Sequence, residues 1–422
     1  MMKKIFFAVS ILLLVTMIIP FAMHRFTVAE ALRPESTEES FRAYDGEEET
    51  ESQPDEAAFS PSSDRKDELK TEAKSAYLTE YESGTVLFAR NENARLPIAS
   101  MTKIMLLNLC FEKTESGELS FEEKVTVSDR ASGMGGSQVF LEAGGEYSAD
   151  DLIKSVVVAS ANDASVALAE KMYGSEESCV DAMNEKCREW GLDNTSFRNC
   201  TGLPAAEHFS SARDVSVMLT KLISHKDYFR YSGIWTDEIR HAKGNVTGLT
   251  NTNKLSRFYA GCDGGKTGYT SDAGFCLAAT AKRGTMRVVA VVIGETNSKK
   301  RFGDVSSMFD YAFGHFTNRA VVEAGKPLGQ TVEVAKGKCG TVGTVAEQDF
   351  FVFGKKGEGG DIEVRFEGEK IVAPVRKGQV VGKLIVTKDN VPVGKVNVLA
   401  DRDVGAKKFI DYLKDVASGW MI

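Results

Sequence analysis

The sequence predicts a mixed α/β or α+β body, followed by a small all-β sandwich or barrel and a C-terminal amphipathic helix. Within residues 75–294, β-like segments at both ends enclose helical stretches, which is typical of a mostly antiparallel sheet covered by helices. From about residue 320, short valine-rich segments alternate with Gly, Lys and Asp turns, as in small all-β domains. The last segment, 404–422, repeats apolar residues at helical spacing.

The first 31 residues predict export from the cytoplasm. Lys3 and Lys4 precede a long apolar run, and Ala29-Glu30-Ala31 offers a small-residue cleavage site. This order is that of a secretory signal peptide covering residues 1–31. The run is close to the ~20 residues that span a bilayer, so an uncleaved anchor is the alternative. Either way, we expect the protein at the outer face of the cytoplasmic membrane.

Residues 32–72 predict a disordered acidic linker. The segment is rich in Glu, Ser, Asp and Pro and lacks the apolar periodicity needed to offset chain entropy. Residues 35–72 hold 14 acidic and four basic side chains, a net charge of −10, so with −8 for the whole chain the remainder carries only +2. The acidity is therefore local, and the absence of a basic domain argues against a nucleic-acid partner.

The body, residues 73–318, shows a clear order of elements. We expect a hairpin over 75–90, helices over 100–112, 148–159 and 163–173, and a second hairpin over 274–294. The all-β domain follows at 319–403, where the expected strands include 331–334, 350–353, 362–366, 383–386 and 395–398.

The C-terminal helix, 404–422, has one strongly apolar side. That side carries Phe409, Ile410, Leu413, Val416, Trp420 and Met421, while the opposite side carries Lys407, Lys408, Asp411, Lys414 and Asp415. An amphipathic helix with a tryptophan and three lysines suits a membrane surface. The alternative is a helix that packs against the all-β domain.

The seven cysteines show no C-x-x-C spacing, and the five histidines are scattered. This pattern disfavours zinc ribbons and redox motifs and predicts mostly buried single thiols. We therefore expect no metal and no cofactor.

A first chemical motif is Ser100-Met101-Thr102-Lys103, at the start of a predicted helix. Residues i and i+3 share one helix face, and the positive end of the helix dipole favours negative charge on the serine. Lys103 can deprotonate Ser100 when a nearby cation or desolvation favours its neutral form. Alone the motif is weak, since many helices begin with Ser three residues before Lys.

A second motif, Ser160-Ala161-Asn162, lies at a break between two predicted helices. A hydroxyl and an amide two residues apart can face one cleft, although helix capping would also explain them.

The third motif is Lys266-Thr267-Gly268, just before the second hairpin. It offers a cation, a hydroxyl and a position without a side chain, which substrate backbone can approach. The preceding Gly264-Gly265 lacks the earlier glycine of a phosphate-binding loop and opens no helix, so nucleotide binding is excluded.

These three motifs, in this order and in an exported chain, form a specific set. With them the sequence resembles serine-type D-alanyl-D-alanine carboxypeptidases, the low-molecular-mass penicillin-binding proteins of peptidase family S11. The resemblance covers about residues 73–422 and is carried by segments 96–103, 159–164, 194–204, 263–270 and 373–382.

The resemblance implies a β-lactamase/transpeptidase-like catalytic domain at 73–318. Ser100 would attack the bond between the two D-alanines of a peptidoglycan stem pentapeptide, Lys103 would take its proton, and Ser160 would protonate the leaving D-alanine. The implied substrate-binding residues are Asn162, Lys266, Thr267, Gly268, Tyr269 and Arg301. β-Lactam antibiotics would act as inhibitors.

Two rival functions remain at this point. A class A β-lactamase shares Ser-x-x-Lys and Lys-Thr-Gly, but the middle motif here is Ser-Ala-Asn and two further segments follow. An inert cell-wall-binding module would tolerate loss of Ser100 or Lys103, yet every motif side chain is present.

Overall fold

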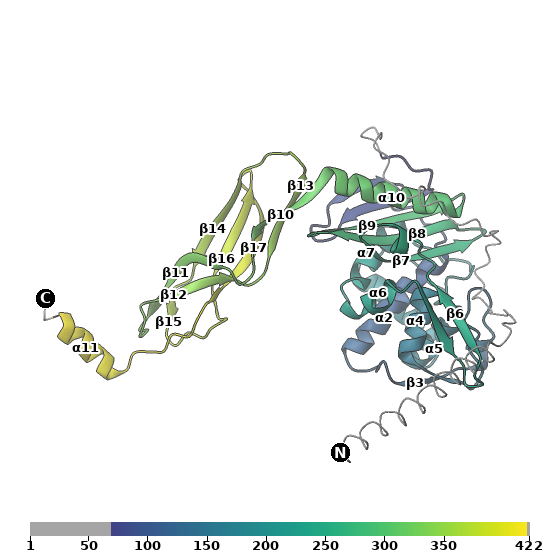
Figure 1. Cartoon of the computed structure of the whole chain (residues 1–422), viewed down its shortest axis with the longest axis horizontal. Helices are drawn as coiled ribbons and strands as arrows, with labels where there is room; N and C mark the ends of the chain where they lie inside the picture. The colour runs from purple at the N-terminus through teal and green to yellow at the C-terminus, as the bar shows by residue number, and fades with distance from the viewer. Residues whose placement is uncertain (1–68, 420–422) are drawn as a thin grey trace, which may run out of the picture.

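Strands from both ends of the N-terminal domain form one five-stranded sheet (Figure 1). The computed structural model describes residues 69–419, so the predicted signal peptide and nearly all of the predicted linker lie outside the described residues. The sheet has the order β2-β1-β9-β8-β7, and each neighbouring pair is antiparallel, as predicted. Its strands are β1 (Ser75–Glu80), β2 (Val86–Arg90), β7 (Cys262–Thr270), β8 (Gly274–Arg283) and β9 (Met286–Glu295).

Strand β9 lies between two hydrophobic cores. Its side chains alternate between them: Val289, Val291 and Ile293 join one core, and Val288, Ala290 and Val292 join the other. Because successive side chains point to opposite faces of a sheet, a strand covered on both faces needs apolar residues at every position. This burial explains the unbroken apolar run over residues 288–293.

Helices cover both faces of this sheet. Helix α10 (Ser298–His315) packs on one face (Figure 1). A helical part covers the other face with α2 (Lys103–Glu115), α4 (Ala149–Val158), α5 (Asn162–Tyr173), α6 (Glu176–Glu189) and α7 (Ala212–Leu222). The predicted helices over 148–159 and 163–173 correspond to α4 and α5. Shorter elements are β3 (Lys124–Thr126), α3 (Asp129–Ser132), β4 (Glu146–Ser148), η3 (Lys226–Tyr228), α8 (Phe229–Ser232), β5 (Thr236–Arg240), β6 (Val246–Thr250) and α9 (Leu255–Phe258).

The C-terminal domain is all-β and begins directly after α10. A two-stranded sheet pairs β10 (Phe316–Val322) with β13 (Phe350–Lys355). A second sheet has the order β14-β16-β17-β12-β11-β15. Its strands are β11 (Pro327–Ala335), β12 (Thr341–Ala346), β14 (Ile362–Gly368), β15 (Ile371–Val372), β16 (Val380–Lys388) and β17 (Val391–Ala400). A core of its own, rich in valine, holds this domain together.

A small set of contacts joins the two domains. Phe316 on β10 and Phe353 on β13 stack with ring centroids 5.3 Å apart, and both pack against the core between α10 and the five-stranded sheet. The side-chain amide of Asn318 donates to Glu80 Oε1 at 3.0 Å and to the Thr285 carbonyl at 3.2 Å. Glu80 and Asn318 are buried, so this polar joint is shielded from water and its hydrogen bonds are costly to leave unmade.

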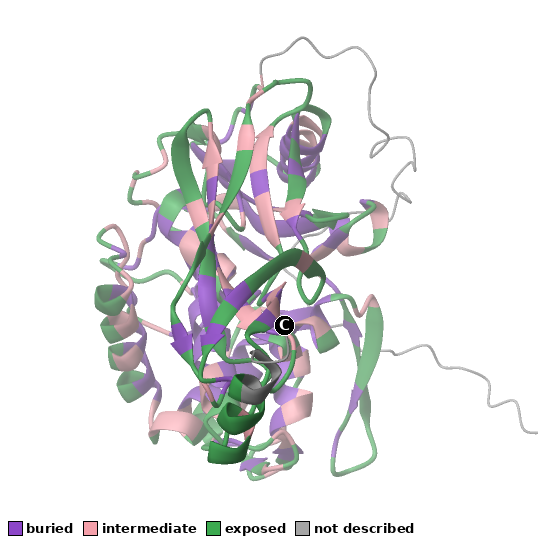
Figure 2. Ribbon diagram, turned by 90° about the vertical axis from the view of Figure 1, so that its left-hand side faces the viewer, coloured by how far each residue is buried: buried purple, intermediate pink, exposed green. Residues whose placement is uncertain are grey.

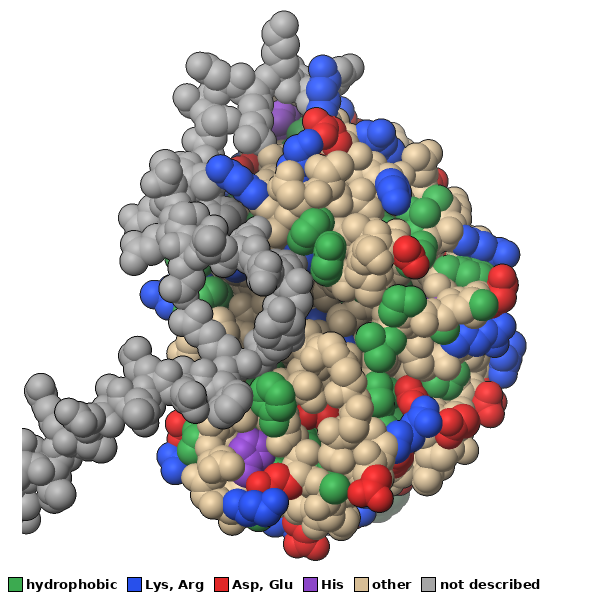
Figure 3. All heavy atoms as spheres, turned by 90° about the vertical axis from the view of Figure 1, so that its right-hand side faces the viewer, with side chains coloured by type: hydrophobic (Ala, Val, Ile, Leu, Met, Phe, Trp, Pro, Cys, Tyr) green, Lys and Arg blue, Asp and Glu red, His purple; other side chains and the backbone are tan. Residues whose placement is uncertain are grey.

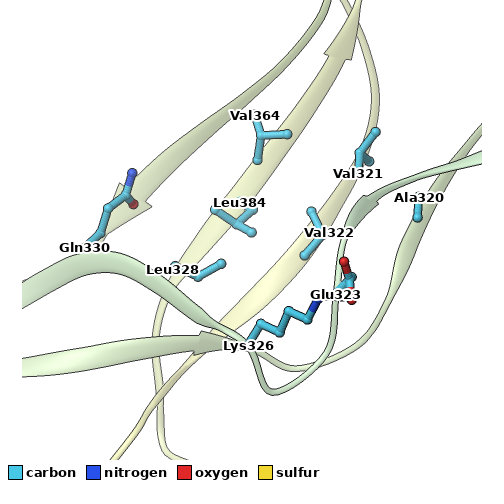
Figure 4. A pocket seen from close by; sticks show the side chains of 9 residues that line it. All are labelled: Ala320, Val321, Val322, Glu323, Lys326, Leu328, Gln330, Val364 and Leu384. Atoms are coloured by element: carbon cyan, nitrogen blue, oxygen red, sulfur yellow. Dashed lines mark ion pairs between the residues drawn. The ribbon is translucent and has the colours of Figure 1, made fainter.

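A cavity of 330 Å³ opens in the β domain (Figure 4). Its lining is mostly aliphatic, with an ion pair between Lys326 and Glu323 at 2.5 Å. The aliphatic lining side chains include Val322, Leu328, Val364 and Leu384. The cavity contains none of the predicted site residues.

Helix α11 (Phe409–Gly419) carries its apolar side in solvent (Figure 2). Phe409 is 78% exposed, and Ile410, Leu413 and Val416 are also exposed. Packing of this face against the β domain is therefore not observed in the described part of the chain. Within residues 69–419, no helix combines the length and the hydrophobicity needed to cross a bilayer. Trp420 and Met421 lie outside the described residues.

Candidate active site

The predicted nucleophile, Ser100, lies in a tight 3₁₀ turn at the start of the predicted helical stretch. The turn is the 3₁₀ segment η2 (Ala99–Thr102), and the α-helix α2 begins only at Lys103. Ala99 enters the turn with φ +47°, a left-handed conformation that a non-glycine residue adopts at a cost. The helical stretch predicted over 100–112 thus corresponds to this 3₁₀ segment and α2 together. Ser100 is nevertheless half-buried and faces the lysine three residues on.

Lys103 is completely buried and hydrogen-bonds to three acceptors. Its Nζ lies 3.0 Å from Ser100 Oγ, 2.7 Å from Asn162 Oδ1 and 2.8 Å from the Thr201 carbonyl oxygen. The side chain has no exposed surface. Burial disfavours a charged amine, whereas these acceptors serve either protonation state. The site therefore holds a lysine nitrogen in direct contact with a serine hydroxyl.

A second serine–lysine contact lies beside the first. Lys266 on β7 donates to Ser160 Oγ at 2.7 Å, and both residues are buried. Ser160 sits between α4 and α5 with φ +61°. Non-glycine residues in this conformation persist only where the surroundings impose it, and such strain concentrates at functional sites.

Asn162 links Lys103 to the loop over residues 135–141. Its Nδ2 donates to the Gly135 carbonyl at 2.7 Å, and its backbone N–H donates to Ser137 at 2.7 Å. An amide has two protons on nitrogen and two lone pairs on oxygen, so it keeps further capacity beyond the bonds to Gly135 and Lys103. Asn162 thus fixes the position of Lys103 and lines the same site.

The remaining predicted residues come together on β7 and α10. Thr267 is buried, and Tyr269 is 40% exposed. Arg301, in the first turns of α10, places Nη1 3.3 Å from the Gly268 carbonyl. Lys300 instead forms an ion pair with Glu72. Arg301 is therefore a basic residue of this stretch that contacts β7, and its predicted role in binding a substrate carboxylate stays a prediction.

Gly268 packs tightly against the turn around Ser100. A Cβ at this position would lie 2.5 Å from the Ile98 carbonyl oxygen and 3.2 Å from Ala99 Cβ. The missing side chain therefore makes room for this turn, and the approach of substrate backbone to Gly268 stays a prediction. Strand β7 and the turn around Ser100 touch backbone to backbone.

The sequence alone assigned no role in the site to residues 199–208. Thr201 supplies a backbone carbonyl to Lys103, and a backbone acceptor leaves no signal in residue type. His208 Nδ1 accepts from the Arg198 N–H at 3.0 Å, so Nε2 carries the proton and donates to Thr102 Oγ1 at 2.8 Å. Burial lowers the pKa of His208 to about 4, so this support stays neutral near pH 7.

Residues 69–419 contain no cluster of His, Cys, Asp or Glu side chains that could hold a metal ion. Six of the seven cysteines are buried and unpaired, and Cys339 is exposed. Burial raises the pKa of the Cys187 and Cys262 thiols to about 12, which makes them inert.

The site lies where the sheet meets the helical part. Seen from the end opposite the β domain, the described surface is hollowed between an upper and a lower part (Figure 3). Ser100 and Lys103 come from the turn and α2, Ser160 and Asn162 from the α4–α5 junction, and Lys266 from β7. A serine hydroxyl in contact with a buried lysine, beside a second serine–lysine pair, is the arrangement of groups that activates a serine nucleophile for acyl transfer.

Comparison with known proteins gives the family. The model for D-alanyl-D-alanine carboxypeptidases matches residues 60–297, and that for the C-terminal domain of penicillin-binding protein 5 matches residues 316–406. The chain belongs to the D-alanyl-D-alanine carboxypeptidase family, as its motifs indicated. This result excludes the class A β-lactamase alternative.

Relatives match over both domains. D-alanyl-D-alanine carboxypeptidase DacF of Bacillus subtilis is 40% identical over 84% of this chain and 92% of its own. Penicillin-binding protein 5 from Haemophilus influenzae has a similar structure, with TM-score 0.63 and 30% identity, covering 80% of this chain and 98% of its own. PBP3 from Streptococcus pneumoniae gives TM-score 0.69 and 28% identity over 79% and 100%.

The contact between β7 and the nucleophile turn generates a prediction. We expect Gly268→Ala to slow labelling by a fluorescent penicillin by about 100-fold, because its methyl group displaces Ile98 and Ala99 and a shift of ~1 Å has that effect. The measurement is the second-order labelling rate, with the melting temperature recorded in parallel. Gly314→Ala on α10, whose Cβ meets nothing within 4 Å, is the matched control and should label normally. Normal labelling of Gly268→Ala would contradict the assigned contact.

Proposed function

We propose that this protein removes the terminal D-alanine from peptidoglycan stem peptides through an acyl-enzyme on Ser100. The observation that carries the proposal is the contact of 3.0 Å between Ser100 Oγ and the buried Nζ of Lys103. Membership of the carboxypeptidase family supports the substrate class. An inert wall-binding module would have no need of a buried lysine held against a serine.

Lys103 would act as the general base in its neutral form. A neutral amine has two protons and one lone pair. Neither Asn162 Oδ1 nor the Thr201 carbonyl can donate, so the two protons point to them and the lone pair points to the Ser100 hydroxyl. When Ser100 attacks, its proton moves to Nζ, and the resulting ammonium donates to its acceptors. The geometry thus supports both the state before and the state after proton transfer.

The oxyanion would form between the turn and β7. The backbone N–H groups of Ser100 and Tyr269 are the proposed donors, and the close packing of Gly268 on Ile98 supports their proximity. Preorganised donors of this kind often supply the largest single contribution to lowering the barrier in acyl transfer.

The leaving D-alanine would receive its proton from Ser160. Lys266 donates to Ser160 Oγ at 2.7 Å and can replace the proton that the serine gives away. The terminal carboxylate of the substrate would bind Thr267 and Arg301, since a hydroxyl and a guanidinium suit a carboxylate. Asn162 would bind the substrate amide, and water would release the acyl group from Ser100.

We also propose that the protein is exported and attaches to the membrane through α11. The exposed apolar residues Phe409, Ile410, Leu413 and Val416, together with Lys407, Lys408 and Lys414, support binding to an anionic lipid surface. The signal peptide over residues 1–31 remains a proposal from its sequence pattern. The β domain would separate the site from the bilayer.

The first prediction concerns the nucleophile. Ser100→Ala should abolish both D-alanine release from a peptide ending in D-Ala-D-Ala and covalent labelling by a fluorescent penicillin, because only the activated hydroxyl can be acylated. Mass spectrometry of the labelled parent should find the adduct on the peptide that contains Ser100. Persistent labelling of the variant would move the nucleophile to another residue.

The second prediction concerns the base. Lys103→Arg should reduce acylation at neutral pH by a factor of ~100 or more, since an arginine stays protonated and cannot accept the serine proton. The measurement is the acylation rate constant by stopped-flow fluorescence. Lys113→Arg in the last turn of α2, where the lysine pairs with Glu118, is the control and should acylate normally. An active Lys103→Arg variant would exclude Lys103 as the base.

The third prediction concerns location. Protein spanning residues 32–403 should keep its activity on soluble peptide but lose flotation with vesicles containing anionic lipid, whereas residues 32–422 should float with them. If the longer protein also fails to float, α11 is not the anchor. If the cellular protein retains residues 1–31, the N-terminal segment holds it at the membrane.

A further inference from the structure

We propose that Asn199 is a positioning residue for the catalytic lysine, acting through the turn that follows it. The inference rests on the proposed function of Lys103 as the base for Ser100. Asn199 touches neither residue. It fixes the backbone carbonyl of Thr201, which in turn holds Lys103 Nζ at 2.8 Å.

The side chain of Asn199 makes four hydrogen bonds within the turn. Its Oδ1 accepts from the Gly202 N–H at 2.7 Å, from the Thr201 N–H at 3.2 Å and from Thr201 Oγ1 at 3.1 Å. Its Nδ2 donates to the Leu203 carbonyl at 2.9 Å. Residues 199–203 belong to no helix or strand, so no backbone ladder holds them. The asparagine therefore supplies the bonds that define the turn.

This turn also contacts the nucleophile. Gly202 has φ +86°, and a Cβ there would lie 2.0 Å from the Ala99 carbonyl oxygen and 2.8 Å from the Ser100 nitrogen. The turn thus reaches the base through the Thr201 carbonyl and the nucleophile through the Gly202 backbone. A displacement of the turn would therefore move both Ser100 and Lys103 and change the distance between Ser100 Oγ and Lys103 Nζ.

A second support holds the turn from helix α6. The buried Glu176 accepts the Cys200 N–H at 3.0 Å and is paired with Arg130. This hydrogen bond fixes the backbone N–H of residue 200, whereas the backbone N–H groups of residues 201 and 202 donate to Asn199. The two supports are therefore complementary.

The consequence is specific to acylation. If the Thr201 carbonyl moves, one Lys103 proton loses its acceptor and the lone pair is no longer directed at Ser100. Asn199 does not contact the substrate-binding residues on β7, so binding before acylation should change little. Loss of Asn199 should therefore lower the acylation rate constant and leave the dissociation constant of the initial complex nearly unchanged.

The experiment compares Asn199→Ala, Asn199→Ser and the parent in stopped-flow acylation by a fluorescent penicillin, with melting temperatures. We expect Asn199→Ala to acylate about 100-fold more slowly, as misplacement by ~1 Å does, with less than a twofold change in initial binding. Asn199→Ser should recover about tenfold of this loss, because a serine hydroxyl can accept from backbone N–H groups in turns.

The control is Asn318→Ala, which removes two hydrogen bonds of a buried asparagine at the domain joint instead of the four made by Asn199. It should acylate at the parent rate. Acylation of Asn199→Ala within twofold of the parent overturns the inference, and so does an equal loss in Asn318→Ala. If the fluorescent penicillin fails to label the parent protein, the proposed function itself is refuted.

If Asn199→Ala does not fold, Asn199→Asp provides the test. It keeps the oxygen that accepts from residues 201 and 202 but loses the proton donated to the Leu203 carbonyl. A roughly tenfold slower acylation with unchanged initial binding supports the inference, by the same positioning argument. Acylation at the parent rate overturns it.

Discussion

The site depends on one buried nitrogen and the three acceptors around it. Lys103 Nζ hydrogen-bonds to three oxygens from three elements. They are Ser100 Oγ in the turn before α2, Asn162 Oδ1 at the start of α5 and the Thr201 carbonyl oxygen in the turn after residue 199. An amine that is buried without hydrogen-bond acceptors costs folding free energy. The three elements that carry these oxygens are therefore favoured in positions close to Lys103 Nζ. The lysine is thus both the proposed base and the point at which three parts of the helical region are held together.

Around this nitrogen, the fold brings glycines and strained residues into contact. Gly268 and Gly202 lie against the same short stretch of backbone, Ile98 to Ser100, from two directions. Ala99 and Ser160 have positive φ, so the two serines of the site both follow or occupy strained positions. Such conformations persist because the surrounding contacts leave no alternative. The rigid backbone around Ser100 keeps its hydroxyl aligned with Lys103, the proposed base.

Much of this could be predicted from the sequence, for physical reasons. The apolar runs within 274–294 indicated the hairpin of β8 and β9, and the three motifs indicated residues that meet at the site. The turn geometry at Ser100 could not be predicted, because the 3₁₀ segment is imposed by contacts with β7 and with residue 202 and not by local propensity. The Thr201 carbonyl was also invisible, because every residue has one. Asn199 was visible only as part of the segment that resembled the family.

The joint between the domains consists of a few buried contacts. Phe316 and Phe353 pack on the core of the catalytic domain, Asn318 bonds to Glu80 and Thr285, and the elongated β domain extends from this joint toward α11 (Figure 1). Because the β domain is long, a small rotation at the joint moves α11 through a much larger distance relative to Ser100. The orientation of the active site relative to anything that α11 contacts therefore depends on the stiffness of these few contacts, independently of the chemistry at Ser100.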